Sequence, residues 1–463
     1  MINQNIIFLY GPPASGKTTL GQCLAKQTGA LFFDVDAVIV QNAGKSIADI
    51  FASEGEPAFR SLEKNTLRQV IEACSKSGGV ISLGGGTLLD AENRSLCEKT
   101  GAVFCLDTPS EEELAFRLNL APGSRPLGNR AHERAAHYAS FNKRIANSFM
   151  LPDSLVVVGT GIAEALMPSA VTVFDENVAR CHPALSQRHL ALIPSGECHK
   201  TPETVMMLWH SFAIAGLGRR DCVAACGGGV TGDLTGFAAA TWMRGINWMN
   251  FPTTLLAMVD ASTGGKTGCD LPDGKNLAGA FHQPKIVVID TDFLKSLPDE
   301  ILKAGRAEMI KHEIIGNLPR NPINGGIPTA QEIAMNLAVK VAIVREDPLE
   351  RLGKRILLNC GHTVAHAIEA ASGYRLSHGQ AVAIGCVEEA RHAVRRGLAP
   401  KTWPEKLAER FMSAGLPVNL PKGMDFVSLS QWMRGDKKRQ GDSVVFALPC
   451  GWGDVRAVKE TLP

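Results

Sequence analysis

The sequence predicts an α/β protein of three domains, on three observations. Short apolar runs alternate with helical stretches over residues 1–150, a second series of short apolar runs begins near residue 155, and Glu, Lys, Ala and Leu recur at helical spacing from about residue 298. Strand–helix alternation is typical of a parallel sheet with helices on both faces. We therefore expect two α/β domains, residues 1–150 and 155–297, with a junction at Leu151–Ser154, and a mainly helical domain over residues 298–463.

In the first domain we expect four strands and three helices. The expected strands are short apolar runs at 6–10, 31–34, 80–83 and 103–107, and the expected helices are 17–27, 61–75 and about 134–148. The stretch 122–134 contains Pro, Gly, Ser, Asn and three Arg. Such a polar stretch is typical of a mobile lid rather than of a core.

The composition is that of an ordinary globular chain. Its 463 residues include 48 Lys and Arg against 46 Asp and Glu, which gives a net charge of +2. This balance gives no reason to expect a nucleic acid or an anionic membrane as partner. No apolar run approaches the ~18 residues of a membrane span, and the start lacks the basic region of a signal peptide. Twelve cysteines without a C-x-x-C pair favour a reducing compartment, so we expect a cytoplasmic protein.

A phosphate-binding loop joins the first strand to the first helix. Gly11-Pro-Pro-Ala-Ser-Gly-Lys-Thr-Thr19 fits the pattern G-x-x-x-x-G-K-[ST] in the strand–loop–helix context that this motif requires. Its glycines let backbone N–H groups surround phosphate oxygens. We expect Lys17 to reach the β- and γ-phosphates of a nucleotide and Thr18 to bind Mg²⁺. Further contacts with the nucleotide are expected from Gly11, Ser15, Gly16 and Thr19.

Residues suited to a phosphate acceptor follow this loop along the chain. Asp34 and Asp36 come directly after the second strand, where carboxylates can serve a metal ion and an acceptor hydroxyl. Gly84–Gly86 follow a buried strand and permit close approach of a small ligand. Arg60 and Arg134 are candidates to hold a carboxylate by paired hydrogen bonds.

Together these motifs resemble shikimate kinase over nearly all of residues 1–150. The matching runs are the phosphate loop, Asp34-x-Asp36, Gly55-Glu-x-x-Phe59-Arg60-x-x-Glu63, Gly84-Gly-Gly86, Arg125-Pro-Leu127 and Arg134-x-x-x-Tyr138. The resemblance implies ATP- and Mg²⁺-dependent phosphorylation of the 3-hydroxyl of shikimate. It implies that Asp36, Arg60, Gly84, Gly85, Gly86 and Arg134 bind shikimate, that Arg125 in the lid binds ATP, and that Asp34 is the base or a metal partner. A different small-molecule P-loop kinase, or a regulatory nucleotide-binding module without activity, stays open.

Glycine-rich loops mark a nucleotide site in the second domain. Strand-like runs occur at 155–158, 171–174, 190–193 and 222–226, and Gly227-Gly-Gly-Val-Thr-Gly-Asp233 follows the last of them. Glycines after a strand are typical of the pyrophosphate contact in a Rossmann-like domain. The loops Pro252–Thr267 and Gly274–Asn276 add an Asp, two Lys and an Asn. Neighbouring lysines suit a phosphorylated or otherwise anionic substrate.

A candidate metal site lies in the helical domain. His362 and His366 are four residues apart, a spacing that puts two imidazoles on one helix face within reach of one ion. His378 can supply a third nitrogen and Glu308 a carboxylate. Nitrogen and carboxylate ligands suit Zn²⁺, and an incomplete ligand set suits a catalytic ion.

From about residue 155 to the C-terminus, the chain resembles 3-dehydroquinate synthase. The supporting runs include Asp175-Glu-Asn177, Gly227–Asp233, Pro252–Thr267, Ala307-Glu-x-x-Lys311, Asn359-x-Gly-His362-Thr-x-x-His366, His378-Gly and Asp436-Lys437. The family converts 3-deoxy-D-arabino-heptulosonate 7-phosphate to 3-dehydroquinate and phosphate with tightly held NAD⁺ and a divalent metal, Zn²⁺ or Co²⁺. The resemblance also implies a homodimer in which Arg244 reaches the substrate of the neighbouring subunit.

The same resemblance assigns the remaining site residues. The implied metal ligands are Glu308, His362 and His378. The implied substrate and catalytic residues are Asp260, Lys266, Lys275, Asn276, Lys311, Lys340, Arg355, Asn359, His366 and Lys437, with His366 in proton transfer. The implied NAD⁺ site comprises Asp175, Asn177, Glu197, Lys200, Gly228, Gly229, Asp233, Thr253, Thr254, Lys275 and Phe293.

Several segments depart from the family pattern. Residues 312–340 look shortened, with a Gly- and Pro-rich stretch at 317–328 in place of helix. The segment before Glu197 and residues 379–436 look trimmed, and one residue looks inserted between Glu350 and Arg355. We expect altered helical packing with activity retained. Another sugar-phosphate cyclase, or a polyol dehydrogenase that releases NADH, stays open as an alternative for this half.

Overall fold

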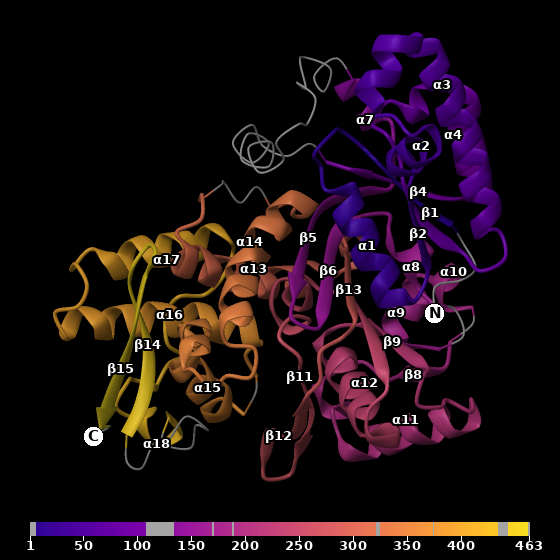
Figure 1. The fold of residues 1–463 in the computed structure, drawn as a ribbon. Helices are drawn as coiled ribbons and strands as arrows, with labels where there is room; N and C mark the ends of the chain where they lie inside the picture. The colour runs from indigo at the N-terminus through magenta and orange to yellow at the C-terminus, as the bar shows by residue number, and fades with distance from the viewer. Residues whose placement is uncertain are drawn as a thin grey trace.

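Eleven strands from both α/β domains form one sheet in the computed structural model (Figure 1). The structure describes residues 6–107, 134–168, 171–187, 189–320, 325–373, 375–433 and 443–461. Residues 6–151, the N-terminal unit, contribute β1 (Ile6–Tyr10), β2 (Leu31–Asp34), β3 (Gly79–Ser82), β4 (Gly101–Leu106) and β5 (Arg144–Leu151). Residues 154–461, the C-terminal unit, contribute β6 (Ser154–Thr160), β7 (Thr172–Asp175), β8 (Ala191–Ile193), β9 (Cys222–Gly227), β10 (Asn247–Pro252) and β13 (Ile286–Asp290).

The direction of the strands changes once across this sheet. Its order is β2-β3-β1-β4-β5-β6-β13-β10-β9-β7-β8, and every neighbouring pair is parallel except β5 and β6. The strands of the two units therefore run in opposite directions. Because open α/β sheets bind ligands at the carboxyl ends of their strands, the two units present their sites at opposite edges of the sheet.

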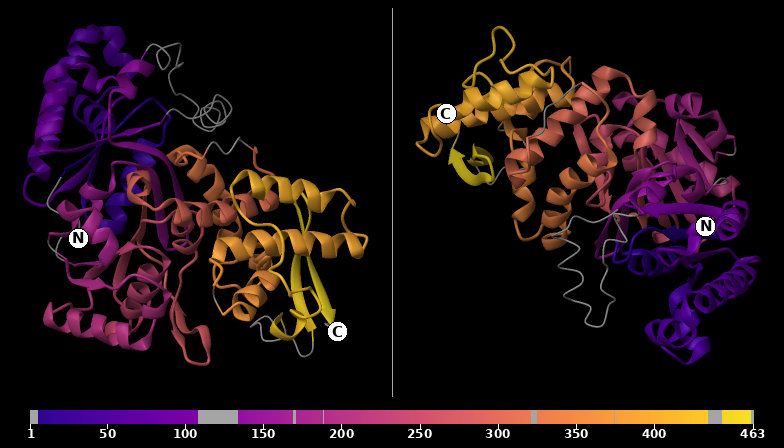
Figure 2. Two further views of the ribbon diagram at one scale, coloured as in Figure 1. Left: turned by 180° about the vertical axis from the view of Figure 1, so that it is seen from behind. Right: turned by 90° about the horizontal axis from the view of Figure 1, so that it is seen from above.

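The helices of the two α/β units pack on the faces of the sheet (Figures 1 and 2). In the N-terminal unit they are α1 (Lys17–Thr28), α2 (Val35–Ala43), α3 (Ile47–Cys74), α4 (Ala91–Thr100) and α7 (Ala135–Ala139). The first part of the C-terminal unit has α8 (Ala163–Leu166), α9 (Glu176–Cys181), α10 (Pro183–Ser186), α11 (Pro202–Ile214) and α12 (Gly229–Thr241), and a hairpin of β11 (Lys266–Leu271) and β12 (Gly274–Phe281).

The last part of the chain is helical, as expected, and lies to one side of the sheet in orange and yellow (Figure 2). Its helices are α13 (Asp299–Gly316), α14 (Ala330–Glu346), α15 (His362–Ala371), α16 (His378–Arg395), α17 (Trp403–Ser413) and α18 (Ser430–Met433), followed by the hairpin of β14 (Ser443–Gly451) and β15 (Asp454–Thr461). Among the residues described, no helix combines the length and the apolar character needed to cross a membrane.

The helix expected at 134–148 is wrong. Only Ala135–Ala139 is helical there, and Arg144–Leu151 is the strand β5. This strand pairs with β4 on one side and with β6 on the other, and Leu151 faces Ser154 across a two-residue turn. Pairing between strands overrides weak helical spacing, and the expected junction at 151–154 is the turn of this hairpin. The expected lid at 122–134 lies outside the described residues apart from Arg134.

The two units share one hydrophobic core. Leu9 and Leu24 from the N-terminal unit belong to the same buried cluster as Val156 and Leu337 from the C-terminal unit. Helix α14 packs against both β5 and β6, and the guanidinium of Arg345 in α14 donates a 2.8 Å hydrogen bond to the carbonyl of Met150. The units are therefore joined by buried apolar packing as well as by the chain.

Candidate functional sites

The N-terminal unit holds its phosphate loop against the neighbouring strand. Gly11 has φ +138°, and a Cβ there would lie 2.8 Å from the carbonyl oxygen of Leu106, so only glycine fits. Gly16, also left-handed at φ 94°, precedes α1, whose first N–H groups point into the loop. The buried hydroxyl of Ser15 has no hydrogen-bond partner among the described residues. The loop therefore has the donors that a phosphate needs.

Lys17 and the expected magnesium residues come together at this loop. The Nζ of Lys17 donates to the carbonyls of Gly11 and Pro12 at 2.9 and 2.7 Å, and burial lowers the pKa of Lys17 to about 8. The hydroxyl of Thr18 donates a 2.6 Å hydrogen bond to Asp34. Asp34 also accepts from the backbone N–H of Ala37 and so caps α2. The hydroxyl and the carboxylate form the pair that a bound Mg²⁺ needs.

The glycine run after β3 lies between two guanidinium groups. A Cβ at Gly86 would be 3.0 Å from Arg60 and 3.2 Å from Arg134, so both arginines approach this run. Arg134 and Tyr138 donate hydrogen bonds to the carbonyl of Gly85. Buried Glu63 accepts a 2.8 Å ion-paired hydrogen bond from Arg60 and holds its guanidinium in place.

Asp36 completes this group of residues. Its carboxylate lies 3.1 Å from the position of a Cβ at Gly84. The N-terminal site thus combines a phosphate loop, a carboxylate pair and two converging cations, which is the chemistry of phosphoryl transfer to an anionic acceptor.

The glycine-rich nucleotide loop of the C-terminal unit ends β9 and begins α12. Gly228 precedes the first turn of α12, and a Cβ on Gly228 would meet the side chain of Thr254 at 3.3 Å. The buried Nζ of Lys200 donates 2.6 Å hydrogen bonds to Asp233 and to Asn276. The carboxylate of Asp233 raises the pKa of Lys200 against the opposing effect of burial.

Most of the other expected nucleotide residues follow the carboxyl ends of neighbouring strands. Asp175 caps α9 by accepting from the N–H of Asn177, and it accepts from the hydroxyl of Ser195. Lys275 lies 3.6 Å from Glu197, and both line a cavity of about 520 Å³. The remaining members, Gly229, Thr253 and Phe293, lie at the start of α12, after β10 and after β13.

Three residues from three helices form a candidate metal centre. The ligand atoms of Glu308 in α13, His362 in α15 and His378 in α16 lie within 4.8 Å of one another. The Nε2 atoms of His362 and His378 are 3.5 and 3.3 Å from the buried carboxylate of Glu308. The Nδ1 of His362 is 3.1 Å from the carbonyl of Cys360, which leaves Nε2 for an ion. This nitrogen and carboxylate set fits Zn²⁺ or a similar divalent ion.

Glu369 supports the third ligand. Its carboxylate lies 3.4 Å from Nδ1 of His378, on the side of the ring away from Glu308. Burial disfavours charge on His378, but hydrogen bonds to Glu308 and Glu369 raise its pKa to about 10. Carboxylate–histidine pairs of this kind orient metal-binding imidazoles.

A cluster of charges surrounds Asp260 beside the metal centre. Lys340 in α14 donates a 2.8 Å hydrogen bond to the carboxylate of Asp260, and Lys311 in α13 lies 3.9 Å from it. Lys311 also pairs with Glu308 and so joins the cluster to the metal centre. Burial raises the pKa of Asp260, but the charges of Lys340 and Lys311 outweigh it and hold the pKa well below its usual range.

His312 is part of this cluster without being charged. It is fully buried, and burial with nearby Lys311 lowers its pKa to about 4. Its ligand atom lies within 4.8 Å of Asp260 and Glu308, so these three residues form a second group with metal-binding geometry. The two lysines neutralise that group, so the histidine-rich group is the better cation site.

Comparisons with known proteins match both halves of the chain to known families. Sequence models described as 3-dehydroquinate synthase N-terminal and C-terminal match residues 190–304 and 305–439. The chain is 44% identical over 276 residues to the 3-dehydroquinate synthase of Synechococcus sp.. This alignment covers 57% of this chain and 75% of that protein. It is 41% identical over 314 residues to that of Symbiobacterium thermophilum, covering 64% and 87%.

The chain belongs to the 3-dehydroquinate synthase family. A shikimate kinase model matches residues 13–156, so a shikimate kinase domain is fused to the synthase. The chain accordingly joins the shikimate kinase and 3-dehydroquinate synthase activities of the shikimate pathway in one polypeptide.

Solved structures of sugar-phosphate cyclases share the fold of the synthase half. A 2-deoxy-scyllo-inosose synthase complexed with carbaglucose-6-phosphate, NAD⁺ and Co²⁺ matches with TM-score 0.60 and 26% identity, covering 68% of this chain and 95% of that chain. ValA, the 2-epi-5-epi-valiolone synthase of Streptomyces hygroscopicus subsp. jinggangensis 5008 with NAD⁺ and Zn²⁺ bound, matches with TM-score 0.59 and 25% identity, covering 68% and 94%.

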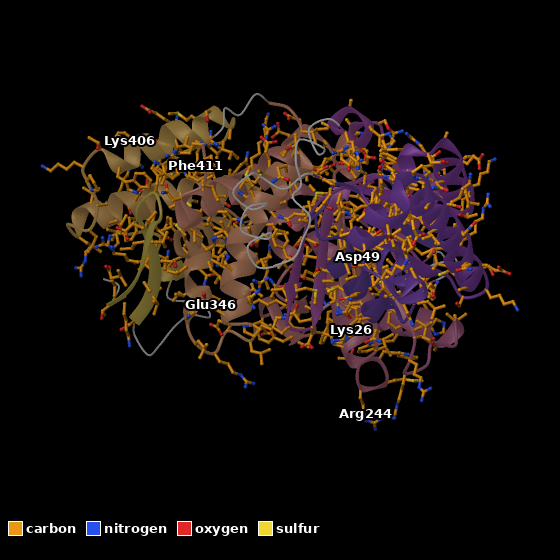
Figure 3. The ribbon with its side chains drawn as sticks, turned by 45° about the horizontal axis from the view of Figure 1, so that its top comes forward. Lys26, Asp49, Arg244, Glu346, Lys406 and Phe411 are labelled. Carbon is orange, nitrogen blue, oxygen red and sulfur yellow. The ribbon has the colours of Figure 1, made fainter. Side chains whose placement is uncertain are left out.

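Some expected residues of the synthase half stand apart from the Asp260 cluster. Lys266 is half-exposed and pairs with Glu350 at 2.5 Å, although it also lines a small cavity beside Gly228. Arg244 is exposed and projects from the surface (Figure 3). His366 is exposed, with its ring centroid 5.5 Å from that of His362, so the i, i+4 spacing does not bring it into the metal group.

The remaining expected residues fall in two classes. Arg355 is buried and donates to the carbonyl of Gly264, which links it to the loop after Asp260. Asn359 is half-buried and ends the turn before α15. Arg125 of the kinase half and Lys437 of the synthase half lie outside the described residues.

Sequence reasoning gave no site role to Glu369 or His312. Glu369 lies on the same helix as His362, about two turns further along α15, and an acidic residue on the helix of an expected metal ligand is a signal that could have indicated its role. His312 follows Lys311 directly, but its place beside Asp260 depends on packing between distant segments. No local pattern predicts that contact.

Proposed function

We propose that the synthase half converts 3-deoxy-D-arabino-heptulosonate 7-phosphate to 3-dehydroquinate and phosphate, with NAD⁺ and a divalent metal, Zn²⁺ or Co²⁺. The observation that carries this proposal is the junction of Glu308, His362 and His378 with the cluster of Asp260 and two lysines. A metal centre and anion-binding lysines in one site suit oxidation and elimination on a sugar phosphate.

The donor set of the metal centre fits a catalytic ion. Glu308, His362 and His378 would hold it, Glu369 would fix the ring of His378, and a fourth position would remain for substrate. When bound, the ion supplies Lewis-acid polarisation of a substrate hydroxyl. Lys311 offsets the negative charge of Glu308 and so tunes the charge of the site.

The substrate's anionic groups would meet the cationic cluster. Lys311, Lys340 and Arg355 provide buried positive charge, and Asp260 holds Lys340 in position. Asn276, Lys266, Lys275, Asn359 and Lys437 are proposed as further substrate contacts. His366, exposed beside the metal ligands, is placed to exchange a proton with substrate or water.

The loop after β9 would bind the pyrophosphate of NAD⁺. Backbone N–H groups at Gly228 and Gly229 begin α12, where the helix dipole favours anions. The Lys200–Asp233 pair fixes the adjacent loop through Asn276. Asp175 and Glu197 offer carboxylate oxygens for ribose hydroxyls.

We propose that the kinase half transfers the γ-phosphoryl group of ATP to the 3-hydroxyl of shikimate. Lys17 would contact the phosphates, and Thr18 with Asp34 would hold Mg²⁺. Arg60 and Arg134 would bind the shikimate carboxylate over Gly85–Gly86, with Asp36 on its hydroxyls.

Phosphate release tests the synthase proposal. Purified full-length protein is incubated with the heptulosonate phosphate, NAD⁺ and Zn²⁺, before and after chelation. We expect phosphate release that the chelator abolishes, without net NADH. Stoichiometric NADH would indicate a dehydrogenase, and absence of release with metal and NAD⁺ bound would contradict the proposal. Shikimate-dependent formation of ADP tests the kinase proposal in the same preparation.

The synthase half is proposed to form a homodimer. Arg244 is exposed and projects from the surface of the chain (Figure 3). Met243 and Arg244 both have positive φ, at 47° and 70°, a costly backbone conformation that holds the arginine outward. An arginine held in this way can complete the phosphate-binding part of a neighbouring subunit's site.

A further inference from the structure

A cavity of about 270 Å³ lies against helix α13, on the face opposite the metal centre. Two stripes of residues divide this helix. The cavity face carries Arg306, Met309, Ile310 and Glu313. The opposite face carries Glu308, Lys311 and His312. Each stripe follows the i, i+3, i+4 spacing of one helix face, so the cavity is separate from the proposed active site.

The walls of the cavity are largely apolar. Helix α14 contributes Met335, and the Gly- and Pro-rich stretch after α13 contributes Leu318 and Ile327. Met335 is 37% exposed although it lines a hollow, and Ile327 is exposed beside it. Apolar side chains around an open cavity gain free energy when a ligand removes them from water. The Gly- and Pro-rich stretch, residues 317–328, is one of the segments in which the sequence looks different from the family pattern.

Arg306 places a positive charge inside these walls. It is only 5% exposed, and its Nη2 donates a 2.5 Å hydrogen bond to the carbonyl of Gly326. No carboxylate among the described residues forms an ion pair with it, and the sequence of 321–324 contains no acidic residue. A guanidinium without an ion pair, set in largely apolar walls, can bind an anion through its remaining N–H groups.

The carboxylates that line the cavity already have other partners. Glu313 accepts two hydrogen bonds from Arg410, at 2.8 and 2.6 Å. Glu332 accepts from the N–H and hydroxyl of Thr329 and so caps α14. The charge that remains to be matched is therefore that of Arg306.

The floor of the cavity is fixed by hydrogen bonds. The side-chain amide of Asn336 donates to the carbonyl of Met309 at 2.9 Å, and its oxygen lies 2.8 Å from Nδ1 of His312. His312 in turn lies 3.9 Å from Asp260. The Asn336–His312 pair thus separates the cavity from the Asp260 cluster and holds the cavity in shape.

We propose that this cavity binds a small monocarboxylate with an apolar body. The carboxylate would accept paired hydrogen bonds from the free edge of Arg306, as a planar guanidinium favours. The apolar part would lie against Met309, Ile327 and Met335, whose flexible methionines adapt to an aromatic or branched group. The site is independent of the substrates of both enzymes.

Calorimetric titration of the full-length protein with 3-phenylpropionate tests the proposal. The matched probe is 3-phenylpropionamide, which has the same shape without the charge. We expect saturable binding of the acid at one site per chain and no measurable binding of the amide. Because neither probe is a substrate, the result does not depend on the proposed function. Absence of binding by the acid, or equal binding of acid and amide, overturns the proposal.

Two variants locate the site. Arg306→Gln removes the charge and is expected to weaken binding of the acid by about tenfold or more. Met335→Glu puts a negative charge, which repels the carboxylate of the probe, at a wall position that is already partly exposed. We expect a similar loss of affinity for the acid. Met412→Glu on α17, 53% exposed and outside the cavity, is the matched control and should bind as the parent does.

Shikimate kinase activity checks that each variant is folded. If Arg306→Gln fails to fold, the affinity of Met335→Glu for the acid tests the location of the site. Unchanged affinity in the folded cavity variants, or an equal loss in Met412→Glu, overturns the assignment of this cavity.

Discussion

Substitution of Glu369 should weaken metal binding although Glu369 is not one of the proposed metal ligands. Its carboxylate is buried and lies 3.4 Å from Nδ1 of His378, whose Nε2 faces Glu308 at 3.3 Å. The imidazole is thus held between two carboxylates, and Glu369 determines which nitrogen carries the proton. Loss of such a partner typically lowers metal affinity by about 10- to 100-fold. Each tenfold step corresponds to about 1.4 kcal/mol, so we expect a loss of about 1.4 to 2.8 kcal/mol.

Competition with a chromophoric chelator measures this change. Glu369→Gln keeps the shape and removes the charge, and Glu369→Ala removes the contact. Glu388→Gln is the control, because Glu388 is a buried glutamate of α16 that pairs with Arg391 rather than with a metal ligand. Kinase activity confirms folding. Zn²⁺ affinity equal to that of the parent in both Glu369 variants would refute the assigned role of Glu369.

Three further predictions concern the core, the phosphate loop and the dimer. Leu337→Ala in the shared core should lower the free energy of unfolding by about 2–5 kcal/mol and lower the inactivation temperature of both enzymes. Thermal inactivation measures this effect, with Leu352→Ala at an exposed leucine as the control, and an unaffected kinase would contradict a shared core. ATP affinity, measured by titration, should fall between about pH 7 and about pH 9.5, because Lys17 has a lowered pKa of about 8 and loses its charge in this range. Lys17→Met should make ATP affinity independent of pH over this range, and a pH-independent affinity in the parent protein would contradict the role of Lys17. Mixing inactive Arg244→Ala with inactive His362→Ala should restore part of the synthase activity, and no recovery in mixed dimers would exclude a contribution across subunits.

The glycine-rich site motifs were predictable because the backbone conformation of each depends mainly on residues close together in the sequence. Gly11 has φ +138°, a backbone conformation that favours glycine, and Gly16 is also left-handed at φ 94°. The glycine loop that ends β9 and begins α12 is likewise a run of residues adjacent in the sequence. Such runs carry their geometry in the sequence, so Lys17, Thr18 and Asp34 lie together as expected.

The strand β5 was not predictable from helical spacing because it is stabilised by pairing with other strands rather than by contacts within its own segment. Its partners are β4 and β6, and its residues have mixed burial rather than a clear alternation. The Pro152-Asp153 pair between two apolar runs is a hairpin signal that indicates the turn. Once the hairpin is recognised, the single sheet through both units follows.

Contacts between helices that are distant in the chain could not be predicted from the sequence, because they depend on tertiary packing. The cavity beside Arg306 requires α13, α14 and α17 to pack around one stretch of chain. His366 illustrates the converse, because its spacing from His362 suggests a shared ion while the third ligand comes from α16. Which of the two histidines comes within reach of Glu308 is decided by tertiary packing.

Paired assays of two single-site variants test the central claim that one folded chain carries two independent catalytic sites. The account predicts that Lys17→Ala abolishes shikimate-dependent ADP formation and leaves chelator-sensitive phosphate release intact. It predicts the reverse for His362→Ala, which also loses bound metal. Loss of both activities from either change, in protein that unfolds in the same transition as the parent, would contradict the account.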